Sequence, residues 1–251
     1  MANYIVITGA SSGIGCAAAR AFAQRGKHLI LTARRLQRLE TLKAELSETY
    51  PALNILVKYA DLSVPKEADA FYDSLKDYPL ETWINNAGFG YYSCVADQIP
   101  GKTAQLLHLN VEALTLLSLR FVHDYQNCPD AQLINISSTG GYTIVSNAVT
   151  YCASKFYVSA FTEGLARELQ IKNAALRAKV LAPAATKTEF GQVANNTDAY
   201  DYDKYFTAYH SSQEMAQFLI KLYDSDKTVG IVDRETFQFQ LCDPLLPYAA
   251  H

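Results

Sequence analysis

The chain has 251 residues, of which 49% are hydrophobic and 19% charged, and its formal net charge at pH 7 is −3. This composition is ordinary for a globular protein, no apolar run approaches the roughly 18 residues of a membrane-spanning helix, and the acidic balance does not favour nucleic acid as a partner. The five cysteines lack paired C-x-x-C spacing, which argues against a zinc site or a disulfide framework, so we expect no metal.

Short apolar runs alternate with helical patterns along most of the chain. The predicted strands cover residues 4–8, 28–33, 54–59, 82–85, 131–137 and 176–181. The predicted helices cover residues 13–26, 35–49, 66–77, 100–126 and 148–172. Strands that are apolar throughout and separated by helices are typical of a parallel sheet covered on both faces. We therefore predict an α/β fold with a doubly wound, mostly parallel, Rossmann-type sheet.

The chain is predicted to form a single domain over residues 1–251, because no linker, low-complexity tract or repeat divides it. Residues 184–210 are rich in Asn, Asp and Tyr, and such a long irregular stretch is uncommon unless it is functional. We predict a substrate lid at about 187–210. After a helix near 211–224, either of two strand-like runs, 228–232 and 236–241, could join the sheet. The N-terminus enters the first strand without a basic start or a cleavage site, so we expect a cytoplasmic protein.

A glycine-rich segment, T-G-A-S-S-G-I-G, follows the first predicted strand and leads into an Ala-rich helix. Glycines let the backbone turn tightly and approach a pyrophosphate, whose charge then lies at a helix N-terminus. Ser11 or Ser12 could cap that helix or bind phosphate. The spacing G-x-x-x-G-x-G differs from G-x-G-x-x-G, but its place between a strand and a helix favours dinucleotide binding. The predicted contacts are Gly9, Ser11, Ser12, Gly13, Ile14 and Gly15.

The end of the second predicted strand indicates which dinucleotide binds. NAD enzymes usually carry an acidic residue there for the ribose 2′-hydroxyl, whereas this chain has Arg34 and Arg35 and no acidic residue before Glu40. A guanidinium can hold a 2′-phosphate in a bidentate fork, and a carboxylate would repel it. We therefore predict NADP(H) as the cofactor, with NAD(H) as the alternative. A simpler interpretation is that the two arginines only begin the next helix.

These motifs, and others that follow in the same order, resemble the short-chain dehydrogenase/reductase family over about residues 4–190. Asp61-Leu62 follows the third predicted strand, N-N-A-G at 85–88 follows the fourth, and a segment similar to P-G-x-x-x-T begins at Pro183. Ala184 replaces the glycine of that last motif. The resemblance implies contacts to adenine, to the adenosine ribose and to the nicotinamide carboxamide, in that order along the chain. The implied residues are Asp61, Leu62, Asn86, Ala87, Gly88, Pro183, Thr186 and Thr188.

A hydride reduction of a carbonyl also needs a general acid beside the substrate oxygen. Tyr151 and Lys155 lie four residues apart on a predicted helix, and therefore on one face. A free tyrosine has a pKa near 10, and a nearby ammonium lowers it. We predict Tyr151 as the acid/base and Lys155 as the group that tunes its pKa. Both also belong to the predicted cofactor site, since Lys155 could hold the nicotinamide ribose.

The spacing of Tyr151 and Lys155 recurs at 72/76, 200/204 and 223/227, so spacing alone is weak. Only Tyr151 has a small hydroxyl, Ser138, thirteen residues earlier at the end of a predicted strand, where ligands lie in open α/β sheets. The family resemblance implies that Ser138 anchors the substrate oxygen, with Ser137 as the alternative. It also implies that Asn110 holds a water in a proton path to Lys155.

These residues together predict an NADP(H)-dependent oxidoreductase that moves a hydride between nicotinamide and a carbonyl or alcohol substrate. The alternative is a catalytically silent NADP(H)-binding sensor or scaffold, and an epimerase or dehydratase on a related fold also remains open. Aromatic residues crowd the stretches 89–93, 139–145 and the segment beyond Thr188, which favours an apolar or ring-containing small-molecule substrate. The resemblance further implies a homodimer or homotetramer built through the helices at 100–126 and 148–172.

Overall fold

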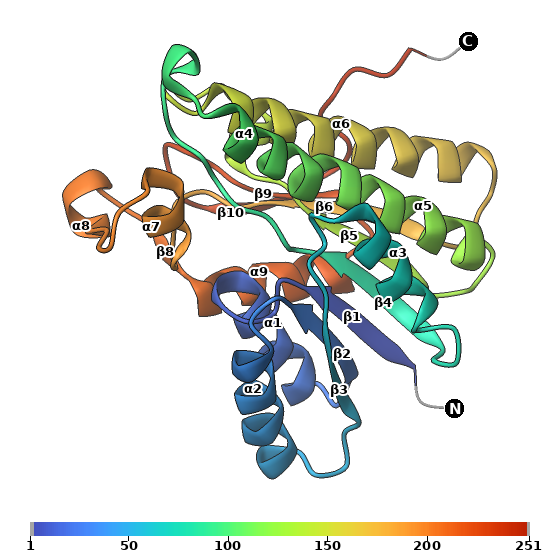
Figure 1. Ribbon diagram of the computed structural model, residues 1–251. Helices are drawn as coiled ribbons and strands as arrows, with labels where there is room; N and C mark the ends of the chain where they lie inside the picture. Colours follow the sequence, from blue (N-terminus) through green and yellow to red (C-terminus); the bar gives the residue numbers. More distant parts are fainter. Residues whose placement is uncertain (1–2, 250–251) are drawn as a thin grey trace.

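An eight-stranded sheet runs through the centre of the molecule (Figure 1). The structure is a computed structural model that describes residues 3–249. The strands are β1 (Tyr4–Thr8), β2 (His28–Ala33), β3 (Ile55–Tyr59), β4 (Leu80–Asn85), β5 (Gln132–Ile136), β6 (Arg177–Ala182), β9 (Val229–Val232) and β10 (Phe239–Cys242). Their order across the sheet is β10-β9-β6-β5-β4-β1-β2-β3, and every neighbouring pair is parallel except β9 and β10. The predicted doubly wound, mostly parallel sheet is confirmed.

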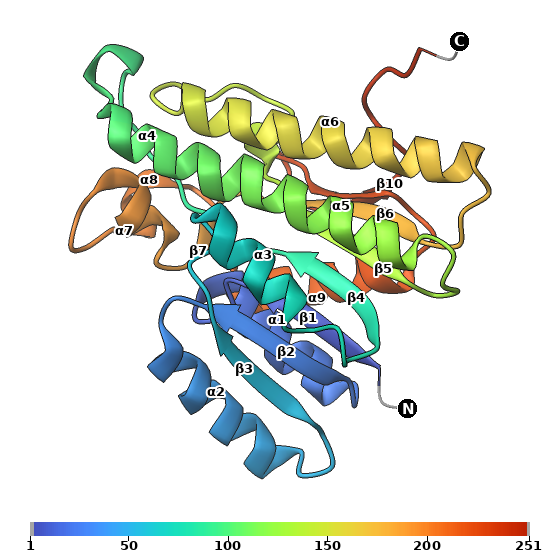
Figure 2. The same ribbon diagram turned by 45° about the vertical axis from the view of Figure 1, so that its right-hand side comes forward.

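Helices cover both faces of this sheet (Figure 2). On one face lie α1 (Gly13–Gln24), α2 (Leu36–Thr49) and α9 (Ser212–Asp224). On the other lie α3 (Pro65–Asp73), α5 (Leu114–Tyr125) and α6 (Val149–Ile171), with α4 (Pro100–Leu107) leading into α5. Among residues 3–249, no helix combines the length and the apolar character that crossing a bilayer requires.

Alternate side chains of each strand enter two separate cores. Ile5 and Ile7 of β1 pack with Phe22 and other residues on the α1 face, whereas Val6 packs with Trp83 on the α5 face. Trp83 and Phe22 are fully buried, and burying a side chain of this size contributes about 2–3 kcal/mol. The period of two along each strand therefore fixes which residues face which layer of helices.

Both C-terminal runs join the sheet, a point that the sequence left open. β9 pairs with β6 in parallel, and β10 returns antiparallel as the edge strand. The second strand begins later than the apolar run at 236, because the Asp233 carboxylate accepts from the backbone N–H groups of Glu235 and Thr236 and makes a turn there. Phe237 follows in the left-handed region, with φ of 57°.

The predicted helix at 100–126 contains a wider turn. Between α4 and α5 the chain forms a π-helical segment, η2 (His108–Ala113), which the sequence pattern did not indicate. Single π-turns of this kind occur frequently at functional sites. The segment carries Asn110, whose side chain is 1% exposed. The Asn110 side chain bonds the backbone of Phe89, in the segment that follows β4.

The segment predicted as a lid has secondary structure of its own. It contains α7 (Phe190–Asn195) and α8 (Tyr202–Tyr205), which project from the sheet at the left of Figure 1. A small parallel pair, β7 (Thr186–Lys187) with β8 (His210–Ser211), closes its base. This segment, called the lid below after its predicted role, therefore leaves and rejoins the main fold at neighbouring points.

Candidate active site

A cavity of about 550 Å³ lies at the carboxyl ends of the parallel strands. The sheet order reverses between β1 and β4, and ligands of open α/β sheets bind at such a switch point. Most of the residues predicted from the sequence line this one cavity. They are Gly9, Ser11, Ser12, Gly13, Ile14, Arg34, Arg35, Asp61, Leu62, Asn86, Ala87, Gly88, Ser138, Tyr151, Lys155, Pro183, Thr186 and Thr188.

Two predicted residues, Gly15 and Asn110, do not line the cavity. Gly15 lies beneath the glycine loop, where a Cβ atom would lie 2.4 Å from Asn86 Nδ2 and 2.6 Å from the Gly9 carbonyl oxygen. Glycine is required at this position for packing, because only hydrogen fits between the loop and the turn at Asn86, and the predicted contact of Gly15 with the cofactor stays a prediction.

The glycine loop is held tightly against the N-N-A-G turn. Gly9 has φ of 66°, and a Cβ there would come within 2.8 Å of Ala87 Cα. The Asn86 side chain donates to the Thr8 carbonyl at 2.9 Å, and Thr8 Oγ1 accepts from the backbone N–H groups of Asn86 and Ala87, both at 3.0 Å. Both turns are thus fixed beside the N-terminus of α1.

The N-terminus of α1 fits a bound phosphate group. Ser12 is the N-cap residue, but its side chain makes no capping hydrogen bond, so of the two roles considered for it, capping or binding phosphate, only the second remains a prediction. Its Oγ instead accepts from Arg35 at 2.6 Å. The helix has no acidic residue in its first turn, and uncapped N–H groups at a helix start favour an anion. The close approach that Gly9 permits leaves a cradle that a pyrophosphate would fill.

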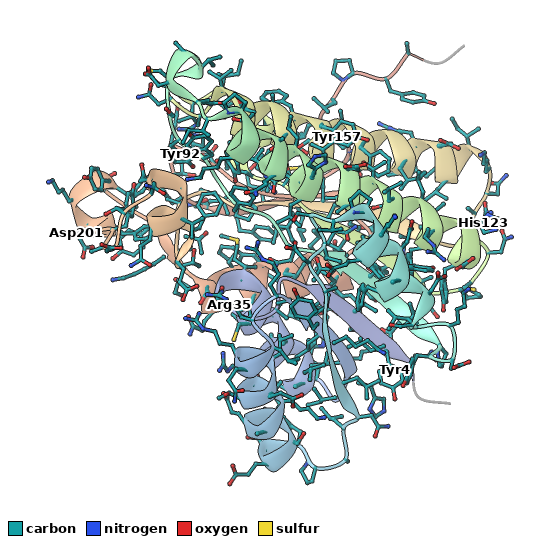
Figure 3. All side chains as sticks on the ribbon, in the orientation of Figure 1. Tyr4, Arg35, Tyr92, His123, Tyr157 and Asp201 are labelled. Carbon is teal, nitrogen blue, oxygen red and sulfur yellow. The ribbon has the colours of Figure 1, made fainter. Side chains whose placement is uncertain are left out.

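Arg34 and Arg35, which follow β2, line the cavity, and each meets a carboxylate. Arg34 lies 3.8 Å from Asp61, and Arg35 donates to Glu189 at 2.7 Å. Glu189 also accepts from Arg38 at 2.6 Å. The sequence analysis did not anticipate Glu189, because 154 positions separate it from Arg35. Arg35 is labelled in Figure 3, at the junction of the α1–α2 side with the lid.

Ser138 and Tyr151 face each other within the same cavity. Ser138 follows β5, and its Oγ accepts from the Gly140 N–H at 3.0 Å. A Cβ on Gly140 would lie 3.4 Å from that Oγ and 3.7 Å from Cε1 of Tyr151, so both side chains border the same point. Ser137 also lines the cavity, but its hydroxyl is engaged elsewhere, since it donates to the Lys155 carbonyl at 2.9 Å and lies 2.8 Å from Ser159.

Burial shifts the pKa of the Tyr151 phenol and that of the Lys155 amine. Tyr151 is 7% exposed, and burial raises its pKa above the ordinary value, while an interaction with the Ser138 hydroxyl opposes that rise. Burial lowers the pKa of Lys155 to about 8. Its Nζ donates to the Ile136 carbonyl at 2.9 Å and lies 5.9 Å from the centroid of the Tyr151 ring. The amine is therefore close to the phenol without hydrogen bonding to it.

Asn110 forms hydrogen bonds next to Tyr151 and Lys155 without lining the cavity itself. Its Oδ1 accepts from the Phe89 N–H at 3.1 Å, and its Nδ2 donates to the Phe89 carbonyl at 3.0 Å and to Ser154 Oγ at 3.3 Å. A Cβ on Gly88 would lie 3.0 Å from Asn110 Oδ1 and 3.6 Å from Lys155 Nζ. Asn110 thus ties the irregular segment that follows N-N-A-G to α6, close to the Lys155 amine.

The segment after Pro183 takes a defined path although Ala184 replaces the expected glycine. The Pro183 carbonyl accepts from the Thr139 N–H at 2.8 Å. Thr186 is 8% exposed and donates to the Ala184 carbonyl at 2.9 Å. The Thr188 methyl lies over the glycine loop, where a Cβ on Gly13 would approach it to 3.2 Å. The segment therefore covers the cavity on the lid side.

Aromatic rings surround the Tyr151 phenol. Its ring centroid lies 5.8 Å from that of Tyr92 and 5.4 Å from that of Phe190 in α7; Tyr92 is labelled in Figure 3. The predicted aromatic residues that line the cavity are Phe89, Tyr92, Phe190, Tyr200, Tyr202 and Phe206. Tyr142 turns away to donate to Glu163 at 2.5 Å. Val145, Arg234 and Phe237, which the sequence did not single out, also line it.

Residues 3–199 match the family model described as short chain dehydrogenase. A Gallus gallus relative, dehydrogenase/reductase SDR family member 11, is 32% identical over 203 residues, covering 77% of this chain and 78% of the relative.

Two solved structures are similar over most of their length. A short-chain dehydrogenase from Sphingobium yanoikuyae in complex with NADPH is 29% identical, with a TM-score of 0.82, covering 93% of this chain and 89% of that one. The bulky-bulky ketone specific alcohol dehydrogenase from Comamonas testosteroni is 28% identical, with a TM-score of 0.76, covering 91% of this chain and 85% of that one.

Proposed function

The chain belongs to the short chain dehydrogenase family, and we propose that within this family it is an NADP(H)-dependent carbonyl reductase or alcohol dehydrogenase. The observation that carries the proposal is the meeting of Ser138, Tyr151 and Lys155 in one cavity with the glycine loop. The three residues come from β5 and α6, and the loop from β1. A chain that kept only a binding role would not need a buried phenol and a buried amine at the same point.

The cofactor site would use the residues that line the cavity from β1 to β6. The uncapped start of α1 and the glycine loop would hold the pyrophosphate, and Asp61 and Leu62 would contact the adenine. Arg34 and Arg35 would contact a 2′-phosphate, which is the argument for NADP(H) over NAD(H). The NADPH complex of the Sphingobium relative is consistent with this choice. When bound, the nicotinamide supplies or accepts the hydride at the substrate carbon.

Tyr151 is the proposed general acid, which supplies the proton when the carbonyl is reduced. The Ser138 hydroxyl would donate to the substrate oxygen and orient it toward the phenol, which gives up its proton as that oxygen becomes negative. The Lys155 amine, kept close by its bond to the Ile136 carbonyl, favours the phenolate when it is charged. Asn110 holds the backbone at Phe89 beside that amine, which would keep open a path by which a proton returns.

The aromatic wall favours an apolar or ring-containing carbonyl compound as substrate. Tyr92, Tyr151 and Phe190 form a mutually packed group, and aromatic surfaces of this kind bind apolar ligands. The preference of the Comamonas relative for bulky ketones, as its description states, agrees with this. Residues 187–210 would act as the lid, since α7 carries Phe190 over the phenol.

The test is the oxidation of NADPH, measured at 340 nm, with a panel of ketones and aldehydes. We expect turnover by the wild-type chain and a fall of at least about 100-fold in kcat for Tyr151→Phe, because general acid catalysis contributes about 10²–10⁴. The matched control is Tyr157→Phe, which makes the same change on the exposed side of α6 and should leave kcat unchanged. Full activity of Tyr151→Phe would exclude the mechanism.

A further inference from the structure

The guanidinium group of Arg35 already has partners on three sides. Its Nε and Nη2 donate to the hydroxyls of Ser11 at 3.3 Å and Ser12 at 2.6 Å, and its Nη1 donates to Glu189 at 2.7 Å. Arg38 donates to the second oxygen of the same carboxylate at 2.6 Å. The carboxylate of Glu189 thus lies between two guanidinium groups, in the arrangement that proteins use to bind a phosphate.

Glu189 is ionised in this position at neutral pH. The hydrogen bond from Arg38, and then that from Arg35, holds the pKa of its carboxyl group below the ordinary value. The side chains of Arg35, Arg38 and Glu189 are 44%, 50% and 38% exposed, so water and salt reach the pair. An exposed pair of this kind is weak, of the order of 1 kcal/mol or less, and an incoming ligand can displace it.

Glu189 would oppose the binding of a 2′-phosphate at this end of the cavity in two ways. The carboxylate takes the guanidinium donors that the phosphate needs, and its negative charge repels the phosphate if both stay. A cofactor that carries a 2′-hydroxyl in place of the phosphate meets neither obstacle. The residue should therefore affect one cofactor and not the other.

We propose that Glu189 is a specificity-determining residue that weakens the preference of this protein for the 2′-phosphorylated dinucleotide. The inference rests on the proposed function, since it concerns the same cofactor site. Arg35, one of the two arginines proposed to favour NADP(H), and Arg38 in the next turn are both paired with this acidic residue of the segment 187–210. The cofactor choice of this chain then depends on the balance of three side chains, Arg35, Arg38 and Glu189.

The experiment compares NADPH and NADH binding to the full chain and to Glu189→Gln, with dissociation constants from nicotinamide fluorescence. We expect the Kd for NADPH to fall by about three- to tenfold, as for the loss of one nearby like charge at a partly exposed site, and the Kd for NADH to change by less than about twofold. The change should shrink in 0.5 M NaCl, because salt screens exposed charges. Adenosine 2′,5′-bisphosphate and 5′-AMP, which differ only in the 2′-phosphate, should repeat the contrast by calorimetry.

The matched control is Glu45→Gln. Glu45 of α2 pairs with Arg20 of α1 at 2.7 Å, with 46% and 45% exposure, so the variant breaks a similarly exposed ion pair whose two residues do not line the cavity. It should leave both dissociation constants unchanged. In an Arg35→Gln background, Glu189→Gln should lose most of its effect on NADPH.

Two results would overturn the inference while leaving the proposed function standing. One is an equal change in the Kd of NADPH and NADH in Glu189→Gln, and the other is weaker binding of NADPH, which would mean that the pair holds the lid over the cofactor. Wild-type protein that binds neither dinucleotide would instead remove the proposed function, and the inference with it.

Discussion

Lys155 is a buried amine whose surroundings make the stability of the fold depend on pH. Burial lowers its pKa to about 8 in the folded protein, from 10.5 for an exposed lysine. Between these values the unfolded chain binds more protons than the folded chain, so the free energy of unfolding rises with pH across this window and loses that gain as pH falls through 8. The Lys155 amine must be charged to favour a phenolate. The proposed catalysis therefore needs the charged amine, whereas the fold is more stable with the neutral amine.

We predict that wild-type protein gains about 2 kcal/mol of unfolding free energy over Lys155→Met between pH 7 and pH 9.5, at about 1.4 kcal/mol for each pH unit above the folded-state pKa. Urea unfolding at the two pH values measures the difference. Burial also lowers the pKa of Lys179. Because Lys179 is present in both proteins, its contribution to the pH dependence of stability cancels in the comparison. Parallel pH profiles for the two chains would show that Lys155 keeps an ordinary pKa in the fold.

Three residues of the candidate site show which contacts could be predicted from the sequence and which could not. The structure brings Ser138 and Tyr151 to one cavity, as predicted, because a strand end and a helix face each have a sequence pattern; the role of Ser138 as substrate anchor stays a prediction. Glu189 was missed, because its contact with Arg35 depends on how the lid folds back and no local pattern records it. The packing of Gly15 against Asn86, which requires glycine, was also not predicted, because it depends on how the N-N-A-G turn meets the glycine loop.

At the scale of elements, β6 and α9 are joined by one buried lysine. Lys179 of β6 is 1% exposed, and its Nζ donates to the carbonyls of Leu222, Tyr223 and Ser225 at 2.9, 2.9 and 2.7 Å. The last carbonyls of a helix lack partners within the helix, and a cation there is favoured by the helix dipole. The lysine therefore ends α9 and fixes it to the sheet.

Lys179→Met should lower the free energy of unfolding by about 2–4 kcal/mol, because buried carbonyl groups lose their donor. Denaturant unfolding by circular dichroism measures the change. Arg177→Met, on the same strand but exposed, is the control and should shift stability by less than about 0.5 kcal/mol. An equal effect of both substitutions would mean that the strand, and not the cap, is being perturbed.

The elements that the sequence predicted best are those with a strong period. The six strands from β1 to β6 and the long helix α6 were predicted to within a few residues, since burial imposes their patterns. The π-turn at Asn110 was not, because it adds one residue to a helix without changing the apolar pattern. The β7–β8 pair was also missed, since two residues are too few for a period and its register depends on the lid.

At the scale of the whole molecule, the outer face of α5 and α6 carries exposed apolar side chains. Leu119 and Tyr157 are 54% and 38% exposed, and Tyr157 stacks on Phe161 with centroids 5.9 Å apart. Exposed apolar groups on adjacent long helices favour an interface. This agrees with the homodimer or homotetramer implied by the family resemblance, which we propose for this chain.

Sedimentation velocity at micromolar concentration should then give a dimer or tetramer for the wild-type chain. The double variant Leu119→Glu with Tyr157→Glu should give a smaller species, since charges at the centre of an apolar interface are costly. Val95→Glu, at an exposed apolar position in the short helix η1 (Val95–Asp97), should keep the wild-type size. A wild-type monomer would remove the proposed interface.

The paired base of the lid has a consequence for how such a protein could diversify. Because β7 and β8 hold the two ends of the segment side by side, lengthening the chain between them costs little, about 0.6 kcal/mol for each doubling of a loop. Insertions, deletions and exchanges in this stretch would reshape the wall that meets the substrate while the phenol, the amine and the glycine loop stay in place. New substrate ranges could therefore arise by replacing one surface segment, with the chemistry inherited unchanged.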